Sequence, residues 1–360
     1  MRLWGDGSRL VVMLIDGIHI PLTAPFTRDG RSYLHKLEYN VRRYSLTPAS
    51  GLVALTFETE GTSLSDAETA ETLRVIGDVA DPAKVLVAAV AKDSVRSVLS
   101  VAESAAQEGF DLVLLAAPPQ WESLSEQEVM VYFQTIADRS PLPIALSSGA
   151  RRQGYRLSVA KIAELARHGN VLGIYDHGLT VERLRAISEA SGRVRREVLV
   201  TSVFAPVTRR MVQRGETEEA GFVAAASIGS AGAGISAPKH GIKTRTKPVG
   251  FQVMAMGSST GFAELLRSGV AGAMLSLAAC SPQACYEAYA AFKDGDPALA
   301  EEKVQRLAEA DAMVEHLGIG GIKYGCDCNG YYGGEPRLPR LALNAEGRAE
   351  VERVLAGIRN

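Results

Sequence analysis

Residues 94–116 read SVRSVLSVAESAAQEGFDLVLLA, and this stretch sets our expectation for the fold. Ser94 is a typical helix N-cap, a helical pattern runs to Glu108, and Gly109 stands where a C-cap glycine belongs. Leu112–Ala116 is then a short apolar run of the kind found in strands that are buried on both faces. A helix followed directly by a buried strand is the repeating unit of a parallel α/β fold.

The same unit recurs along most of the chain. The other predicted strands are Leu10–Leu14 with Ile18–Leu22, Leu52–Thr56, Val85–Val90, Ile144–Leu146, Val171–Ile174, Val253–Met256 and Gly272–Leu277. Helical patterns lie between them, at Ser125–Asp138, at Ser158–His168 and after Ser65, where Glu68 completes a capping-box pattern. Alternation repeated about eight times predicts a (β/α)8 TIM barrel.

Two regions interrupt the alternation. We expect the barrel over residues 8–290, with an insertion at about residues 193–250 between the sixth helix and the seventh strand, and a helical C-terminal segment over 291–360. The insertion contains the apolar run Val198–Val207 and the cationic segment Lys239–Lys247, so it should be partly ordered. Its apolar side chains could bury against the barrel wall, a neighbouring subunit or the active-site mouth, and we favour a subunit interface.

Composition excludes several classes of protein. The chain has 360 residues, a net charge of −2 and a pI of about 6.4, so no electrostatic field favours nucleic acid or an anionic membrane. No run reaches the length of a membrane span, and the N-terminus lacks the apolar core of a signal peptide. The four cysteines, Cys280, Cys285, Cys326 and Cys328, do not have zinc-site spacing and are expected to be free thiols of a cytoplasmic protein.

A polar cluster follows the predicted strand in Asn170-Val-Leu-Gly-Ile-Tyr-Asp-His177. Barrel enzymes carry their chemistry at this end of the strands, so Tyr175 and His177 are candidate catalytic residues. A tyrosine can act as a general acid or base, and a histidine titrates near neutral pH. Two structural alternatives stay open: Tyr175 fills space with its hydroxyl bonded internally, and His177 is an ordinary loop residue.

Several segments together resemble the dihydrodipicolinate synthase and N-acetylneuraminate lyase family of class I aldolases. They are Pro21–Gly30, which resembles a strand-one motif ending in Thr-Pro-Phe, and Gly51–Glu68, Gly109–Pro119, Pro141–Leu146, Gly269–Ser276 and Pro336–Leu341. The resemblance covers nearly the whole chain apart from the insertion, and it implies the same barrel fold.

The resemblance also implies where the functional positions lie. The lysine of the family's Gly-Ile-Lys-Asp motif, which forms a Schiff base with pyruvate, falls on Tyr175. The Gly-Thr-Thr-Gly-Glu loop that binds the pyruvate carboxylate falls on Thr56–Glu60, where only the final glutamate agrees. The proton-relay tyrosine falls on Ser147, and the arginine that grips a substrate carboxylate falls on Arg152. Tyrosine offers no amine for an imine, so the mechanism is not inherited unchanged.

From these matches we predict three catalytic residues, Tyr175, His177 and Ser147, and four substrate-binding residues, Arg152, Glu58, Thr59 and Phe57. Tyr175, Ser147, Arg152 and Glu58 should line one cavity. Lys92, just past the third strand, is the alternative amine, although a loop-capping role fits it better. Glu58 and Glu60 should point to one side of a continuing strand and could bind a metal with His177 or His19, but the spacing defines no metal signature, so we expect no metal and no cofactor.

Two hypotheses about function follow. The first is a lyase or aldolase-like enzyme that acts on a small oxo-acid or sugar-acid without the usual Schiff base, and that does not make dihydrodipicolinate. The second is a non-catalytic barrel that binds a ligand or assembles with partners. Fold alone does not decide between them. The resemblance further implies a homo-oligomer, a dimer or a tetramer, whose partner is a small carboxylate rather than nucleic acid or membrane.

Overall fold

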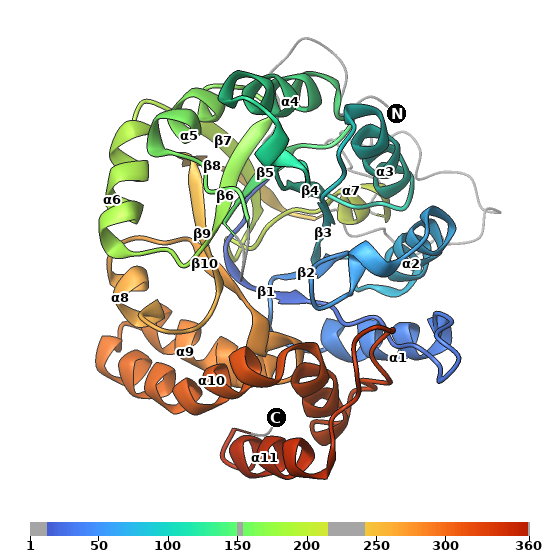
Figure 1. Cartoon of the computed structure of the whole chain (residues 1–360). Helices are drawn as coiled ribbons and strands as arrows, with labels where there is room; N and C mark the ends of the chain where they lie inside the picture. Colours follow the sequence, from blue (N-terminus) through green and yellow to red (C-terminus); the bar gives the residue numbers. More distant parts are fainter. Residues whose placement is uncertain (1–12, 150–153, 215–241, 359–360) are drawn as a thin grey trace, which may run out of the picture.

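The structure, a computed structural model, describes residues 13–149, 154–214 and 242–358. Its barrel strands are β1 (Gly17–Pro21), β2 (Gly51–Ala54), β3 (Val85–Val90), β4 (Leu112–Leu115), β5 (Ile144–Ser148), β6 (Val171–His177), β9 (Gln252–Gly257) and β10 (Gly272–Leu275). They close in the order β1-β10-β9-β6-β5-β4-β3-β2, and every pair is parallel (Figure 1). The predicted (β/α)8 barrel is confirmed.

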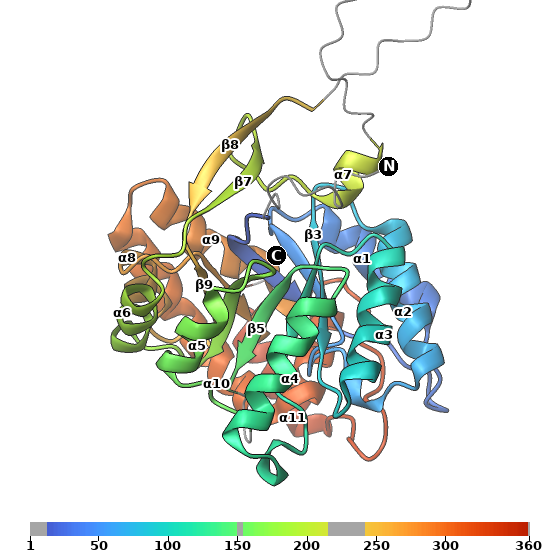
Figure 2. The ribbon, with the colours of Figure 1, turned by 90° about the horizontal axis from the view of Figure 1, so that it is seen from above.

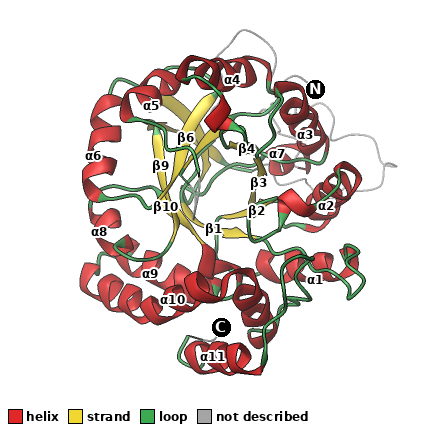
Figure 3. Ribbon diagram, in the orientation of Figure 1, coloured by secondary structure: helices red, strands yellow, loops and turns green. Residues whose placement is uncertain are grey.

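Helices surround the strands, as Figure 3 shows. They are α1 (Leu34–Ser45), α2 (Asp66–Val79), α3 (Val95–Gln107), α4 (Glu126–Arg139), α5 (Val159–Ala166), α6 (Val181–Ala190), α8 (Phe262–Arg267) and α9 (Pro282–Lys293). The main hydrophobic core lies between the outward-facing strand side chains and these helices, with Leu73 and Ile76 of α2 fully buried in it. Removing this apolar surface from water is the main force that holds the helices on the barrel.

The predicted serine caps begin four of these helices. Ser65, Ser94, Ser125 and Ser158 each accept a hydrogen bond from a backbone N–H one turn into the helix. Ser65 and Glu68 complete the predicted capping box. Each cap stabilises its helix by about 1 kcal/mol, and it fixes where the chain leaves the loop that precedes the helix.

A second cluster of apolar side chains fills the barrel interior. It combines inward-facing strand residues such as Val85 and Leu112 with Met13, Leu14 and Ile15. Met13 and Leu14 of the predicted strand Leu10–Leu14 lie in no strand, and residues 10–12 lie outside the described residues. Met13 and Leu14 are buried all the same, and the carbonyl of Met13 accepts a hydrogen bond of 3.0 Å from Gln252, the first residue of β9.

The insertion packs at that same end. Its two strands, β7 (Arg196–Thr201) and β8 (Thr244–Val249), form an antiparallel ribbon, and α7 (Arg209–Arg214) follows β7 (Figure 2). The backbone N–H of Arg209 donates to Asp111, which precedes β4, at 2.7 Å, and Val198 is buried in the interior cluster. The described part of the insertion therefore buries against the barrel itself, far from the carboxyl ends of the strands. The predicted subunit interface stays a prediction, and Lys239, the first residue of the cationic segment, lies outside the described residues.

The C-terminal segment contains α10 (Pro297–Cys328) and α11 (Ala345–Leu355). Gly318, with φ of 60°, interrupts the helical backbone of α10. After α10 the chain returns to the loop between β1 and α1, where Phe26 forms a β-bridge with Glu335. This loop and the C-terminal segment thus lie side by side (Figure 1).

Candidate functional site

A cavity of about 470 Å³ opens at the carboxyl ends of the barrel strands. Its walls include Glu58 after β2, Ser147 at the end of β5, His177 at the end of β6 and Ser276 after β10. Trp121, Tyr155 and Phe57 add aromatic surface. Residues at or after the ends of seven strands meet here, because the parallel strands of a barrel all end at the same edge of the sheet.

The loop after β2 presents Glu58 to the cavity. β2 ends at Ala54, and Leu55 and Glu60 both take a left-handed backbone conformation, with φ of 63° and 53°. Such conformations are strained for residues with a side chain and persist only where surrounding contacts hold them. Glu58 is only 5% exposed, and its Oε1 accepts a hydrogen bond of 2.7 Å from the hydroxyl of Ser276.

Glu60 belongs to a different environment. Its Oε1 lies 2.6 Å from the Nζ of Lys323, which is 1% exposed, and its Oε2 accepts the backbone N–H of Arg337 at 3.1 Å. Glu58 and Glu60 were expected on one side of a continuing strand, and this expectation is wrong. The strand ends before them, and the turn that Leu55 starts sends the two carboxylates to different surroundings.

Thr59 and Phe57, both predicted to bind substrate, also lie in different surroundings. The hydroxyl of Thr59 donates to the carbonyl of Leu22 at 2.6 Å and lies fully buried, outside the cavity wall. Thr59 therefore ties the loop to the end of β1. Phe57 lines the cavity, is 44% exposed and lies under the guanidinium of Arg340, 5.5 Å from the ring centre.

His177 projects from the last position of β6 into the cavity. Its imidazole lies against the backbone of Gly257, where an added Cβ would come within 2.6 Å of Nε2. Gly257 also has φ of 101°, a conformation that favours glycine. The backbone carbonyl of His177 accepts a hydrogen bond from Arg156 at 2.8 Å, so both the ring and the main chain of His177 are held.

Tyr175 does not line the cavity, contrary to our expectation. It is fully buried in the barrel interior, and its hydroxyl lies 2.8 Å from the Nδ1 of His19 on β1, across the barrel. Burial raises the pKa of Tyr175 far above its usual range and lowers the pKa of His19 to about 4, so both groups are neutral at physiological pH. Sequence alternation places Tyr175 on the inward face but does not tell at which depth its hydroxyl comes to rest.

Asp176, the third polar residue of this strand end, points away from the barrel axis. It is fully buried and accepts hydrogen bonds from Arg183 on both oxygens, at 3.0 Å on Oδ1 and 2.7 Å on Oδ2, and Oδ1 also accepts one from Arg156 at 3.2 Å. Arg183 also donates to the hydroxyl of Ser148 at 3.2 Å. This network fixes the ends of β5 and β6, and with them the positions of Ser147 and His177.

No lysine is among the described residues that line the cavity. Lys92, the alternative amine, forms an ion pair with Asp66 at 3.2 Å, and its carbonyl accepts a hydrogen bond from Tyr132. Arg152 lies outside the described residues, so its predicted role stays a prediction. Ser147 and Glu58 thus meet in one cavity as expected, whereas Tyr175 does not join them.

The described residues contain no group of three or more His, Cys, Asp or Glu side chains arranged to hold a metal ion. All four cysteines are free, and three of them are buried. Ser276 and Trp121 are cavity residues that the sequence reasoning missed. Ser276 could have been found, because it lies inside the predicted strand Gly272–Leu277, near its carboxyl end. Within the described ranges, no helix is both long enough and apolar enough to span a membrane.

A closed parallel barrel with a cavity at the carboxyl ends of its strands defines the class of (β/α)8 proteins that place binding and catalysis at that end. The profile of the dihydrodipicolinate synthetase family matches residues 14–227, and the chain belongs to this family. The curated relatives are distant. A 4-hydroxy-tetrahydrodipicolinate synthase of Methanothrix thermoacetophila is 24% identical over 340 residues, which cover 94% of this chain and 95% of that protein.

Other relatives match only in part. The synthase of Staphylococcus carnosus is 26% identical over 163 residues, 45% of this chain, and the match spans 55% of that protein's length. Among solved structures, a dihydrodipicolinate synthase of Bacillus anthracis has a TM-score of 0.75 at 19% identity, covering 97% of this chain and 100% of its own. A prophage protein of Escherichia coli K12, solved with pyruvate, has a TM-score of 0.73 at 20% identity, covering 96% and 99%. At these identities the structural likeness shows the fold.

Proposed function

We propose that this protein binds a small oxo-acid or sugar-acid in the cavity at the carboxyl ends of the strands, and acts on it as a lyase without a Schiff base. The observation that carries this proposal is that Tyr175 is buried outside the cavity. It stands at the position that resembles the family's Gly-Ile-Lys-Asp lysine, and its buried hydroxyl pairs with His19. No described lysine lines the cavity to replace the missing amine.

The side chains that remain in the cavity suit a hydroxylated substrate. Ser147 offers a hydroxyl, and Glu58 offers a carboxylate that accepts hydrogen bonds from substrate hydroxyls. His177 is the group best placed to move a proton next to a substrate carbonyl, because its ring faces the cavity and its position is fixed by Gly257. Arg152 is the proposed partner of the substrate carboxylate.

Pyruvate is the natural first probe, since the E. coli prophage protein of similar fold was solved with pyruvate. Glu58 disfavours a carboxylate placed directly beside it, so pyruvate should bind with its carboxylate turned away from the loop after β2. A longer sugar-acid can place a hydroxyl near Glu58 and its own carboxylate elsewhere. We therefore expect a 2-oxo-3-deoxy sugar-acid to bind more tightly than pyruvate.

Borohydride trapping tests the proposed absence of an imine. The protein is incubated with pyruvate and sodium borohydride, and its intact mass is measured. An imine-forming lysine would gain one reduced pyruvate, and we expect no such gain. An adduct would overturn the non-imine proposal, and a Lys92→Arg variant would show whether Lys92 carries it.

A second candidate function is ligand binding without catalysis, which the internal pairing of Tyr175 with His19 favours. Proton exchange separates the two. In D2O, an enzyme that removes a C3 proton of pyruvate replaces the methyl protons with deuterons, so the methyl signal in the proton NMR spectrum decays. A His177→Gln variant should abolish that exchange. Binding without exchange would support the non-catalytic barrel. Failure of pyruvate and of the sugar-acid to bind would refute the ligand class.

The oligomeric state and the cytoplasmic location stay predictions. We expect a dimer or a tetramer, with no nucleic-acid or membrane partner. Light scattering on the full chain measures the mass directly, and a monomer at micromolar concentration would contradict this expectation.

A further inference from the structure

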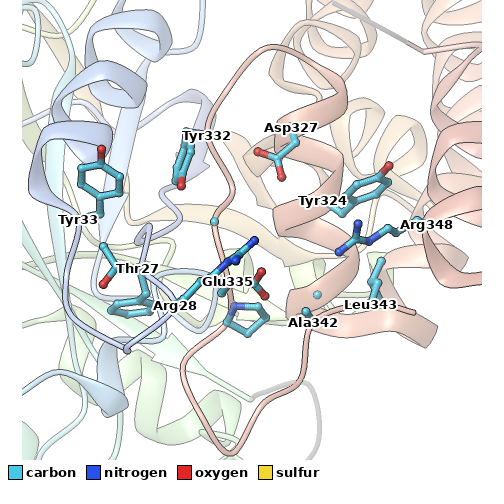
Figure 4. Close-up of a pocket in the computed structure, with 14 residues that line it drawn as sticks. Thr27, Arg28, Tyr33, Tyr324, Asp327, Tyr332, Glu335, Ala342, Leu343 and Arg348 are labelled. Atoms are coloured by element: carbon cyan, nitrogen blue, oxygen red, sulfur yellow. The ribbon is translucent and has the colours of Figure 1, made fainter. Parts of the chain in front are cut away.

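A second cavity, of about 390 Å³, lies between the loop after β1 and the C-terminal segment (Figure 4). One wall comes from Thr27 and Arg28 of the loop and from Tyr33, which precedes α1. The other comes from Tyr324 of α10 and Arg348 of α11. Among the described residues, this C-terminal cavity shares no lining residue with the cavity at the carboxyl ends of the strands.

Two guanidinium groups reach the C-terminal cavity from opposite walls. Figure 4 shows Arg28 extending from the loop and Arg348 from α11. Arg28 is exposed and forms no hydrogen bond or ion pair with another described side chain. Arg348 lies over the ring of Tyr324, 5.3 Å from its centre. A guanidinium offers its donors as a planar fork, which matches a carboxylate or a phosphate.

Two carboxylates face the same space. Asp327 of α10 uses one oxygen to accept the backbone N–H of Gly333 at 2.8 Å. Burial raises the pKa of Asp327 although Arg348 and Lys323 act in the opposite direction, so its charged form would gain from a further cation. Glu335 lines the cavity with its side chain, while its backbone carbonyl accepts the Nζ of Lys323 at 2.9 Å. An ammonium group is the natural partner for such acceptors.

We propose that the C-terminal cavity binds a small zwitterion that carries one carboxylate and one ammonium group. A ligand with only negative charge would meet Asp327 and Glu335, and a ligand with only positive charge would meet Arg28 and Arg348. A zwitterion satisfies both pairs at once. The rings of Tyr33, Tyr332 and Tyr324 provide surface for the carbon chain between its two charges.

The bound zwitterion would join two parts of the chain that are more than 290 residues apart. Phe26, in the cavity wall, lies beneath Lys323 at 4.4 Å and Arg337 at 4.2 Å. Lys323 pairs in turn with Glu60, in the loop that presents Glu58 to the other cavity. A ligand here therefore stabilises the docking of the C-terminal segment on the barrel, and the melting temperature should rise with ligand concentration.

The test uses the full chain and a series of simple probes. Glycine, 4-aminobutyrate and 6-aminohexanoate carry both charges at increasing separation, while hexanoate and hexylammonium each carry one. Affinity is measured by isothermal titration calorimetry. We expect at least one zwitterion to bind at least about tenfold more tightly than either single-charge probe. Equal affinity of a single-charge probe, or no binding of any zwitterion, would overturn the proposal.

Variants locate the site. Arg28→Gln should weaken binding of the tightest zwitterion by about 10- to 100-fold, as expected for the loss of a charge-assisted hydrogen bond. Asp327→Asn should weaken it by a similar factor, and the amide oxygen of the asparagine can still accept the backbone N–H of Gly333. Arg96→Gln is the matched control, since it removes one exposed arginine on α3. His177→Gln should leave the affinity unchanged, because His177 belongs to the other cavity. An unchanged affinity in Arg28→Gln, or a loss in His177→Gln, would refute the assignment to this cavity.

Discussion

Replacing Tyr175 with phenylalanine separates a structural role from a catalytic one. The substitution removes only the hydroxyl that lies 2.8 Å from His19 Nδ1 in the barrel interior. His19 is fully buried, and its Nε2 has no hydrogen-bond partner among the described residues. The variant would remove the side-chain partner of Nδ1 in the barrel interior, which costs about 1–3 kcal/mol. We therefore expect a clear loss of stability and no change in ligand affinity.

The measurement is equilibrium unfolding in urea together with a thermal scan. For a chain of 360 residues, a loss of 1–3 kcal/mol corresponds to a fall in melting temperature of about 1–4 °C. Tyr39→Phe is the matched control. It deletes the hydroxyl of a 44% exposed tyrosine that donates to Gly330, and it should cost less than about 0.5 kcal/mol.

A double-mutant cycle identifies the partner. In a His19→Leu background, Tyr175→Phe should cost close to nothing, because the group it leaves unpaired is already gone. Pyruvate affinity should match the wild type in the Tyr175→Phe variant. Unchanged stability combined with lost binding or lost proton exchange would refute this reasoning and return Tyr175 to the candidate active site.

Other predictions address different parts of the molecule. Burial lowers the pKa of His19 from 6.5 to about 4, so the unfolded chain takes up a proton there before the native protein does. The wild type should lose up to about 3 kcal/mol relative to His19→Gln as the pH falls from 6.5 to 4, and a difference that does not change with pH would contradict this. Gly257→Ala should displace the ring of His177 and weaken ligand binding at least about tenfold, whereas Gly261→Ala, with open space around its added Cβ, should keep the affinity. Glu60→Gln should cost about 3–5 kcal/mol in urea unfolding because it leaves the buried Lys323 unpaired, and a cost below 1 kcal/mol would show that the ion pair matters little. A coupled assay with pyruvate and aspartate semialdehyde should detect no synthesis of dihydrodipicolinate in the wild type or in Tyr175→Lys, since residue 175 lies outside the cavity wall.

Local patterns in the sequence were enough to predict the barrel. The predicted strands Val85–Val90 and Leu112–Ala116 correspond to β3 and β4, and the predicted caps Ser65 and Ser125 are helix N-caps in the structure. These signals are local because strand burial, capping and helix periodicity depend on residues within a few positions of each other. The resemblance of separate segments to one family pointed to the same fold, and the family match over residues 14–227 agrees with it.

The sequence by itself also placed Ser147, His177 and Glu58 near the ends of strands, and all three line the cavity. Only the tertiary structure decided which of the neighbouring side chains line the cavity and which form pairs elsewhere in the barrel. Tyr175 pairs with His19, 156 positions away, and Glu60 pairs with Lys323 on α10. The C-terminal cavity likewise needs Arg28 and Arg348 on facing walls. Such pairings depend on distances between segments that are remote in the sequence and on the left-handed turn at Leu55. Periodicity along the chain predicts neither the distances nor the turn.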